Sequence, residues 1–295
     1  MSTPCPVCGS TTKACCATDD GLHLCRGNPV EGWKKLKSCD NGFIVYRRRE
    51  SCKENAPVFL TEKKENPKID WVPVVKKYTK RLDSFHRNLL STRLKIPDNF
   101  DLFDVGVRVY NGKSAFTIPE QDKDGFTGIS LRYEGEVVTK TMITGSRRGL
   151  CFPKTLMDMP DPVFVVEGFT DCAAMVSAGL TCIGRPSNVG GADMIAGLCR
   201  GRSIVVVGEN DWRLCKVCSG MGCITCGNKG DLFPGKDGVD KVAKKLLRIL
   251  GKNVSKTMPP KGFKDVRDFL TSLDSPWSER GKILIDNMGL TSFQN

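Results

Sequence analysis

Acidic residues follow directly on two short runs of β-branched residues in the second half of the chain. In chain order these acids are Glu167, Asp171, Glu209 and Asp211. Carboxylate oxygens are ligands that Mg²⁺ and Mn²⁺ prefer, and a cation held by them can also bind phosphate groups. If the fold brings the four acids together, they form a site for phosphate chemistry that depends on a divalent cation.

The residues around these acids have the pattern of alternating strands and helices. We expect strands at 163–166, 181–184, 203–207 and 253–257, and helices at 170–178, 191–199 and 237–250. Short β-branched runs that alternate with helical periodicity are typical of a parallel α/β sheet with right-handed crossovers. Ligands bind beyond the carboxyl ends of such strands, so the acids are predicted to lie together at one edge of the sheet.

The preceding part of the chain has a different pattern. Between residues 105 and 152, short alternating runs separated by Gly and Asp predict an antiparallel β region. Before it, apolar residues recur at helical spacing from Trp71 to Leu90, which predicts one amphipathic helix with a basic outer face. A helical and β-rich part is therefore expected before the α/β domain.

The composition of the chain narrows the class of protein. Among the 295 residues, 45 Lys and Arg stand against 33 Asp and Glu, and this formal net charge of +12 favours a polyanion as partner. The N-terminus does not resemble a signal peptide, and no apolar run approaches the roughly 18 residues of a membrane span. Isolated cysteines in apolar surroundings fit a reducing compartment. We therefore expect a soluble, cytoplasmic protein without membrane contact.

Cysteines near the N-terminus have the spacing of a metal site. Four of them follow the pattern C-x2-C-x7-C-x8-C, namely Cys5, Cys8, Cys16 and Cys25. This spacing fits a tetrahedral Zn²⁺ site on a zinc ribbon. Cys15 is an alternative to Cys16 as the third ligand, and His23 could replace a cysteine. Because a cap of about 30 residues has too small a core to fold unaided, metal is favoured over free thiols.

A second group of cysteines is more tightly spaced. It follows the pattern C-x2-C-x4-C-x2-C and consists of Cys215, Cys218, Cys223 and Cys226. Two facing CxxC pairs supply four soft thiolates, so a second zinc site is predicted over a redox or metal-free role. The group lies just after Asp211, where it could contact a polyanionic ligand or a partner protein, or only hold a long insertion in place.

The four acids stand in the order and spacing of a known domain. The segment Val166-Glu167-Gly-Phe-Thr-Asp171, followed by Glu209-Asn-Asp211, resembles the Toprim domain of primases, topoisomerases and some nucleases. In that family a Glu ends the first strand, another acid often follows four residues later, and a D-x-D pair ends the third strand. Here the pair is E-x-D, which keeps an oxygen ligand on a longer side chain. The resemblance implies a Mg²⁺ site at Glu167, Glu209 and Asp211.

Further motifs across residues 100–270 favour the primase type found in bacteria and phages. The segment Lys264-Asp265-Val-Arg-Asp268 resembles the K-D-x-x-D close of primase Toprim domains, and Gly145-Ser-Arg-Arg-Gly149 resembles part of the β-rich half of the primase core. Primases of this type also carry an N-terminal zinc module. The segments expected are a zinc-binding module at 1–50, a linker at 51–70, a helix and β-rich core part at 71–152, a Toprim domain at 160–272 with a cysteine insertion at 212–236, and a C-terminal tail at 273–295.

This resemblance implies a DNA primase, a nucleotidyltransferase that copies a single-stranded DNA template into short RNA primers for replication. Glu209 and Asp211, with Glu167, would hold Mg²⁺ or Mn²⁺ against the phosphates of an incoming ribonucleoside triphosphate. Asp171 would orient or hydrate the metal, Glu167 would assist proton transfer, and the zinc module would bind template. The near-match to a phosphate-binding loop at 230–237 lacks the Ser/Thr and a preceding strand, so we expect a replicative helicase to be a separate protein.

Basic residues near the acids are candidates for phosphate contact. Arg147 and Arg148 lie in a Gly-flanked turn and, together with Arg185, are the candidates for binding nucleotide or template. Two other functions stay open. One is a Toprim nuclease or topoisomerase-like enzyme, although none of the four tyrosines stands in a recognisable breakage-domain context. The other is a non-catalytic, regulatory nucleic-acid-binding protein that kept the fold.

Overall fold

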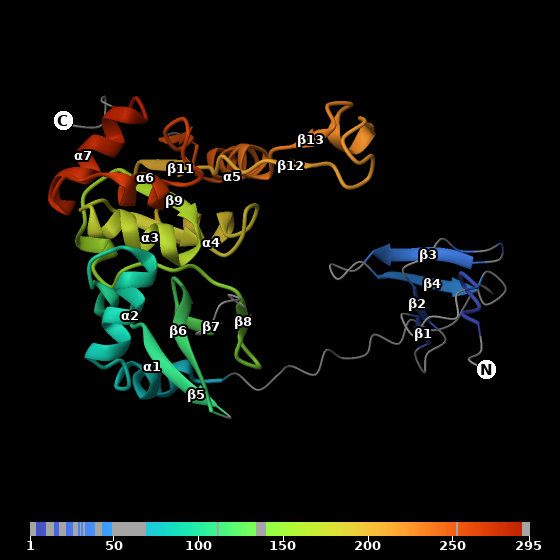
Figure 1. Ribbon diagram of the computed structural model, residues 1–295, viewed down its shortest axis with the longest axis horizontal. Helices are drawn as coiled ribbons and strands as arrows, with labels where there is room; N and C mark the ends of the chain where they lie inside the picture. The colour runs from blue at the N-terminus through green and yellow to red at the C-terminus, as the bar shows by residue number, and fades with distance from the viewer. Residues whose placement is uncertain are drawn as a thin grey trace. The chain divides into compact units, whose positions relative to one another are not determined.

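The computed structural model describes residues 4–9, 15–17, 22–25, 29, 31, 33–38, 43–48, 69–110, 112–133, 140–251 and 253–290. The chain divides into two compact units, Met1–Glu65 and Asn66–Asn295 (Figure 1). Most of the predicted linker, residues 51–68, lies outside the described residues. The two units are therefore described separately.

The N-terminal unit contains a four-stranded antiparallel sheet with the strand order β1-β2-β4-β3. Its strands are β1 (Cys16–Ala17), β2 (His23–Cys25), β3 (Trp33–Ser38) and β4 (Ile44–Arg48). Among the described residues of this unit, the buried apolar side chains are those of Val7, Cys25, Val45 and Tyr46. So few buried side chains remove little apolar area from water, and a unit of this size depends on an additional cross-link such as a metal ion.

Two helices, and not the single predicted helix, begin the second unit. They are α1 (Trp71–Thr79) and α2 (Ser84–Leu94). The chain turns between them because Asp83 accepts a hydrogen bond from the backbone N–H of His86 at 2.9 Å and thereby caps the start of α2. The break also rotates the helical pattern, so Phe85, predicted on the apolar face, is 66% exposed. The prediction of one continuous helix was wrong.

A four-stranded antiparallel sheet follows, with the strand order β5-β6-β7-β8. Its strands are β5 (Gly106–Tyr110), β6 (Lys113–Asp122), β7 (Gly125–Tyr133) and β8 (Lys140–Met142). Helix α1 packs on this sheet through Trp71 and Val75, which meet the buried Ile129 and Leu131 of β7. The predicted β-rich region before the α/β domain is therefore confirmed.

A parallel sheet with the order β10-β9-β11-β14 forms the centre of the second unit. Its strands are β9 (Val163–Glu167), β10 (Cys182–Arg185), β11 (Ile204–Val207) and β14 (Val254–Thr257). The helices are α3 (Gly168–Ser177), α4 (Ala192–Leu198), α5 (Pro234–Leu250), α6 (Val266–Ser272) and α7 (Trp277–Asn287). Each predicted strand and helix of this domain is confirmed to within three residues at either end.

Alternate residues of the central strands face two separate cores. Phe164 and Val166 of β9 pack with α3, α6 and α7, whereas Val163 and Val165 of the same strand pack with α4 and α5. Successive side chains of a strand point to opposite faces, so an apolar run such as 163–166 needs helices on both faces. Figure 1 shows these helices around the central strands. The predicted α/β architecture, preceded by a β-rich part and a four-cysteine module, is confirmed.

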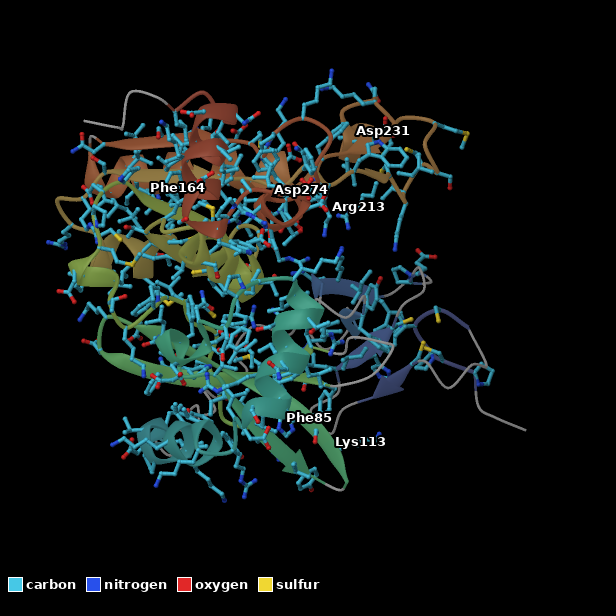
Figure 2. The ribbon with its side chains drawn as sticks, turned by 60° about the vertical axis from the view of Figure 1, so that its left-hand side comes forward. Phe85, Lys113, Phe164, Arg213, Asp231 and Asp274 are labelled. Carbon is cyan, nitrogen blue, oxygen red and sulfur yellow. The ribbon has the colours of Figure 1, made fainter. Side chains whose placement is uncertain are left out.

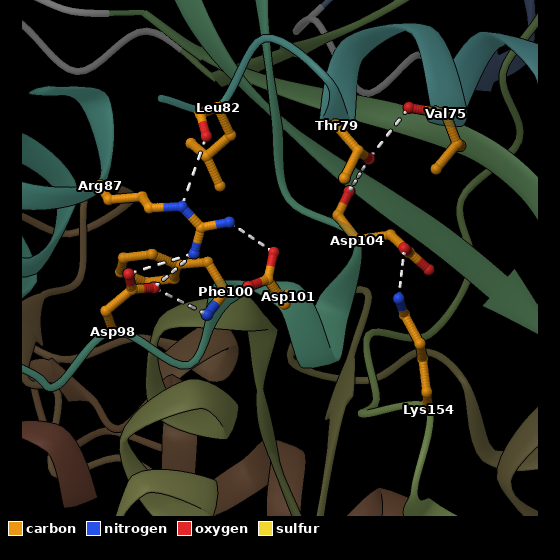
Figure 3. Close-up of polar contacts among 9 residues, drawn as sticks. All are labelled: Val75, Thr79, Leu82, Arg87, Asp98, Phe100, Asp101, Asp104 and Lys154. Carbon is orange, nitrogen blue, oxygen red and sulfur yellow. Dashed lines mark hydrogen bonds and ion pairs between the residues drawn. The ribbon is translucent and has the colours of Figure 1, made fainter. Parts of the chain in front are cut away.

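Polar contacts order the helical region and join it to the α/β domain, where Nδ2 of Asn99 donates to the carbonyl oxygen of Ala173 in α3 at 3.0 Å. Arg87 of α2 donates to Asp98 at 3.1 Å and to Asp101 at 2.5 Å; Asp98 precedes the short 3-10 helix Phe100–Phe103 and Asp101 lies in its first turn (Figure 3). Lys154 pairs with Asp104 at 2.6 Å. Beneath them Phe103 meets Phe169 of α3 edge to face, with ring centroids 5.3 Å apart. The region therefore forms a fixed wall beside α3.

The last part of the described chain also packs on the α/β domain. The predicted C-terminal tail contains α7, whose Leu284 is fully buried in the core that includes α3 and α6. Gly281 lies so close to the backbone of Ala178 that a Cβ there would be 2.2 Å from its carbonyl oxygen. In the part of the chain that the structure describes, no helix is both long and apolar enough to cross a membrane.

Candidate active site and cysteine metal centres

Three of the four predicted acids, Glu167, Asp171 and Glu209, line a cavity of about 630 Å³ between the antiparallel sheet and the carboxyl ends of β9 and β11. Its acidic side chains are those of Glu120, Glu167, Asp171, Glu209 and Asp265. Its basic side chains are those of Arg93, Arg132, Lys140, Arg148, Arg185, Lys264 and Arg267. Basic groups outnumber acidic groups, so this cavity (the acidic–basic pocket) suits an anionic ligand that is bound together with a cation.

Glu167 ends strand β9 and stands directly before helix α3. In the register of the parallel sheet it lies opposite Arg185 of β10, and its Oε2 is 4.0 Å from Nη1 of that residue. Strand β10 can approach the start of helix α3 closely because Gly184 has no side chain. A Cβ on Gly184 would lie 2.3 Å from the carbonyl oxygen of Gly168. The side chain of Glu167 is about one third exposed and lines the pocket.

Glu209 follows strand β11 and also lines the pocket. Burial, followed by the negative charge of Glu167, raises the pKa of Glu209 to about 7, and Lys264 opposes this rise. The chain is held at this point by Asn210, whose backbone N–H donates to the carbonyl oxygen of Lys264 at 2.7 Å and whose side-chain amide donates to the carbonyl oxygen of Phe263 at 2.8 Å. These contacts keep Glu209 directed into the pocket.

Asp211 does not line the pocket. Its Oδ1 accepts a hydrogen bond from the backbone N–H of Gly235 at 2.5 Å, in the first turn of helix α5. A carboxylate at this place satisfies one of the free N–H groups at the start of the helix. The structure thus brings Glu167 and Glu209 to one pocket and gives Asp211 a contact outside it.

Asp171 lies in the first turn of α3 and is 4% exposed. Burial, followed by the charges of Asp265 and Glu209, raises the pKa of Asp171 well above its ordinary value. Its Oδ1 is 3.9 Å from Nε of Arg267, which offsets part of this rise. Asp171 is therefore a buried acid at the back of the pocket, next to the start of helix α6.

The K-D-x-x-D segment acquires a structural explanation at the start of α6. Asp265 caps the helix by accepting from the backbone N–H of Asp268 at 2.8 Å, and Asp268 in return accepts from the backbone N–H of Lys264 at 3.1 Å. The pair differs from a capping box in one respect, because Asp268 accepts from the residue before the N-cap and not from the N-cap Asp265 itself. It fixes the direction of the chain so that Lys264 and Asp265 both line the pocket.

Glu120 is a pocket residue that the sequence interpretation missed. It comes from β6, is 2% exposed, and accepts from the backbone N–H of Gly149 and from Nη1 of Arg148, each at 2.6 Å. The register of β6 and β7 shifts between Glu120 and Gln121, and such bulges often redirect a side chain beside a site. One face of β6 carries Phe116, Ile118 and Glu120. A charged residue in line with two buried apolar residues was the signal in the sequence for a site residue.

The three arginines predicted to bind phosphate lie in different surroundings. Arg148 lines the pocket and, besides Glu120, donates to the carbonyl oxygen of Pro186. Arg147 is exposed and is not part of the pocket lining. Arg185 is fully buried and donates to the carbonyl oxygens of Ser187 and Asn188. Only Arg148 combines exposure with a place in the pocket.

The donor set at the sheet edge fits a hard divalent cation. Glu167 and Glu209 offer carboxylate oxygens, and burial, followed by the charge of Glu167, raises the pKa of Glu209, an effect that a bound cation would oppose. In the described residues, the ligand atoms of Glu167, Glu209 and Asp211 do not all lie within 4.8 Å of one another, whereas those of two cysteine groups do. The cation is therefore expected to bind mainly to Glu167 and Glu209.

The N-terminal cysteine group consists of Cys5, Cys8, Cys15 and Cys25. Sγ of Cys15 is 3.7 Å from Sγ of Cys8 and 3.4 Å from Sγ of Cys25. Four sulfurs at Zn–S distances of about 2.3 Å stand about 3.8 Å apart, so these spacings fit a tetrahedral zinc site and exclude a disulfide. The third member is Cys15, the alternative to Cys16. The side chain of Cys16 lies outside the described part of the chain, and His23 instead packs on Trp33.

The second group unites all four predicted cysteines, Cys215, Cys218, Cys223 and Cys226. The Sγ distances are 3.8 Å from Cys215 to Cys223, 3.7 Å from Cys218 to Cys226 and 3.8 Å from Cys223 to Cys226. These distances also match a tetrahedral zinc site. The two cysteine groups are thus consistent with two zinc sites.

The second group is built from two similar segments of eight residues, 215–222 and 223–230. In each segment the last glycine, Gly222 or Gly230, donates its backbone N–H to the second cysteine of that segment, at 3.2 Å and 3.3 Å. Both glycines have positive φ values. N–H groups directed at sulfur stabilise thiolates that bind a metal. The sequence analysis missed this repeat. Its signal in the sequence is that each CxxC pair is followed, four residues after its second cysteine, by a glycine.

The cysteine repeats stand on a short two-stranded ladder. Strands β12 (Arg213–Leu214) and β13 (Asp231–Leu232) pair antiparallel and join the repeats to Asp211 on one side and to α5 on the other. We call residues 212–233 the zinc knuckle and its paired strands the stalk. Figure 2 labels Arg213 and Asp231, one residue from each strand of the stalk.

Comparisons with known proteins return likenesses of fold only. No family model matches the chain, and no curated protein sequence matches it. The chain is similar to the zinc-binding and RNA polymerase domains of the Aquifex aeolicus primase, with 14% identity and a TM-score of 0.49 over 75% of this chain and 59% of that chain. It thus spans less than two thirds of the length of that structure. It is also similar to the primase fragment of the bacteriophage T7 primase-helicase protein, with 15% identity and a TM-score of 0.40 over 64% of this chain and 71% of that fragment.

Proposed function

We propose that this chain is a DNA primase that synthesises short RNA primers on a single-stranded DNA template. One observation carries the proposal. The acidic–basic pocket sets Glu167 and Glu209 at the end of a parallel sheet against Arg148, Lys140 and Lys264. Adjacent carboxylates and cations are what a metal-bound nucleoside triphosphate requires, because its phosphates need neutralisation from the metal and from the protein.

The residues of the pocket divide the work of nucleotidyl transfer between them. When bound, Mg²⁺ supplies positive charge to the reacting phosphate and its leaving group. Glu167 and Glu209 would hold that cation, and Arg148 and Lys264 would bind the phosphates that extend from it. The primer 3′-hydroxyl would attack the α-phosphorus, and the bond between the α-phosphorus and the leaving pyrophosphate would break. The carboxylate of Glu167 would accept the proton of the attacking hydroxyl.

Buried groups behind the pocket keep these side chains in place. Arg185 stands behind Glu167 and holds the loop after β10 through carbonyl groups, so it would neutralise charge more than bind phosphate. Asp171, paired with Arg267, would orient the site from the start of α3. Pre-set groups of this kind need little reorganisation when charge develops during the reaction. Asp211 stays a predicted metal ligand.

Other parts of the chain agree with a nucleic-acid enzyme. The net charge of +12 favours a polyanionic template. The N-terminal four-cysteine module would bind the single-stranded template, and ribonucleoside triphosphates would be the substrates. A replicative helicase would be a separate partner. The alternative of a Toprim nuclease or topoisomerase-like enzyme would use the same acids on phosphodiesters.

One observation favours a second candidate, a nucleic-acid-binding protein without turnover. Asp211 is occupied by the N–H of Gly235 and lies outside the pocket lining, which weakens the metal site if it cannot rotate. Such a protein would bind single strands and would not extend them. The two candidates differ in one measurable property, the formation of product.

Primer synthesis from ribonucleotides on a panel of single-stranded templates tests the proposal. With Mg²⁺ or Mn²⁺ the wild type should make short RNA products, and Glu167→Gln should lower the rate by about 10²-fold or more. Glu279→Gln on the exposed side of α7 is the matched control and should have no effect. Products that are equal in wild type and Glu167→Gln exclude this site as the catalytic centre. Cleavage of the template without synthesis would support a nuclease.

A further inference from the structure

The zinc knuckle exposes large apolar side chains that cover no core of their own. Trp212 is 57% exposed, Val217 72%, Met221 87% and Ile224 97%. Exposed apolar residues on this scale, gathered on one small module, are typical of a binding surface and not of an ordinary loop. The surface therefore needs a ligand that has apolar faces.

Basic side chains accompany these apolar groups. Arg213, Lys216 and Lys229 are all exposed, and the one acid between residues 212 and 233 is the half-buried Asp231. The sulfur ligands are turned inward, since Cys215 is fully buried and Cys226 is 7% exposed. The charged side chains that the knuckle exposes are therefore basic, and they are complementary to phosphate groups.

The knuckle also has the rigidity that a binding module needs. The stalk pairs Arg213 with Leu232 and Leu214 with Asp231, and four cysteines close the loop above it. The stalk begins two residues after Asp211 and four after Glu209, which lines the acidic–basic pocket. A ligand that binds to the knuckle is therefore held near the edge of the parallel sheet that carries Glu167 and Glu209.

We propose that the zinc knuckle is a second binding site for single-stranded nucleic acid, separate from the N-terminal cysteine module. Trp212 stacks on an unpaired base, and Arg213, Lys216 and Lys229 contact the phosphates on either side of it. Single strands offer apolar base faces and phosphates together, whereas a duplex offers mainly phosphates. A protein that bound the apolar surface would not require three exposed cations beside it. This inference goes beyond the proposed function because binding does not require synthesis.

Fluorescence anisotropy of a labelled oligodeoxythymidine, measured with the full chain, tests this site. The double variant Lys216→Glu/Lys229→Glu should bind about tenfold more weakly or worse at low salt, and its plot of log affinity against log salt should flatten by about 0.7 per lysine. Trp212→Ala should weaken binding about fivefold or more, and Trp212→Phe should restore most of it. Each variant is first checked for unchanged zinc content.

The control and the contrary outcome are as direct. Lys282→Glu/Lys244→Glu makes the same change of charge on the exposed sides of α7 and α5 and should leave affinity within about twofold of wild type, as for distant surface charges. Equal affinity of wild type and the knuckle variants for the single strand overturns the proposal. So does an equal loss of affinity for a hairpin duplex after Trp212→Ala, because stacking on unpaired bases would then play no part.

Photo-crosslinking separates this inference from the proposed function. A benzoylphenylalanine at Val217 should form a covalent adduct with the oligonucleotide on irradiation, whereas the same group at Glu279 should not. The adduct should persist in Glu167→Gln, even though that variant is expected to lose primer synthesis. Its absence at Val217 in a zinc-loaded protein that still binds the oligonucleotide overturns the proposal, whether or not the wild type makes primers.

Discussion

The carboxylate of Asp211 and the backbone N–H of Gly235 join the two ends of the cysteine insertion through a hydrogen bond of 2.5 Å. Gly235 is the second residue of α5, so an acid predicted to bind metal caps this helix from across the base of the stalk. A Cβ on Gly235 would lie 2.6 Å from the same Oδ1, so the approach depends on glycine. The contact makes Asp211 a residue with a structural role as well as a proposed metal role.

Two substitutions of Asp211 should separate those roles. Asp211→Ala removes the acceptor and should lower the free energy of unfolding by about 1 kcal/mol, as the loss of a helix cap does. Asp211→Asn keeps an oxygen acceptor and should unfold close to the wild-type midpoint in urea. If Asp211 also binds Mg²⁺, both variants should need more Mg²⁺ for activity. Equal stability of wild type and Asp211→Ala would show that the cap contributes nothing.

Zinc stoichiometry should follow the two cysteine groups. We expect two zinc ions per chain, measured by elemental analysis of the purified protein, and one after Cys218→Ser or Cys8→Ser, because three thiolates hold zinc far more weakly than four. Cys15→Ser should lose one ion and Cys16→Ser should keep both. The reverse result for this last pair would return Cys16 to the ligand set.

Asp171 should make the protein less stable as the pH rises. Its pKa is raised in the folded state above the ordinary 3.8, so the folded chain binds more protons than the unfolded chain at higher pH, and ionisation of Asp171 opposes folding. Without added Mg²⁺, Asp171→Asn should therefore be more stable than wild type at neutral pH, and the difference should vanish near about pH 4. Urea midpoints across this range measure it, with the exposed Asp274→Asn as control. A difference that grows towards low pH would contradict the assignment.

Two glycines should respond in opposite ways to alanine. Gly184→Ala places a Cβ 2.3 Å from the carbonyl oxygen of Gly168, at the junction of β9, β10 and α3, and should cost about 3 kcal/mol or more. Gly197→Ala in α4 finds its nearest neighbour, the Cδ of Lys123, at 3.5 Å and should gain about 0.5–1 kcal/mol. Thermal or urea unfolding of both variants tests the pair. A tolerated Gly184→Ala would mean that the two strands can shift apart.

Patterns with one physical cause were readable from the sequence. The strands 163–166 and 203–207 were predicted from short β-branched runs that alternate with helical segments. Such runs pack against helices on both faces, and Phe164 and Val165 do face separate cores. Acids at the ends of such strands must emerge at one edge, and Glu167 and Glu209 do so. The cysteine spacing likewise predicted the second group in full.

Features decided by competing local contacts were not readable. Whether the apolar pattern from Trp71 to Leu90 forms one helix or two depends on Asp83, whose side chain captures the N–H of His86 and starts a new helix. The choice between Cys15 and Cys16 turns on a single residue of register in the chain. The site role of Glu120 depends on the bulge in β6 and β7 and on Gly149, which lies far along the chain.

Because the two ends of the stalk meet, the zinc knuckle can be exchanged for another segment without changing the rest of the domain. The chain leaves and re-enters the α/β domain at nearly one point, between Asp211 and Gly235, so the segment between them could be exchanged for a short turn without moving the strands on either side. Loop-closure entropy grows only by about 0.6 kcal/mol for each doubling of length, so insertions of different size are nearly equivalent to the host fold. The same junction is a natural point for grafting a fluorescent or affinity peptide beside the pocket.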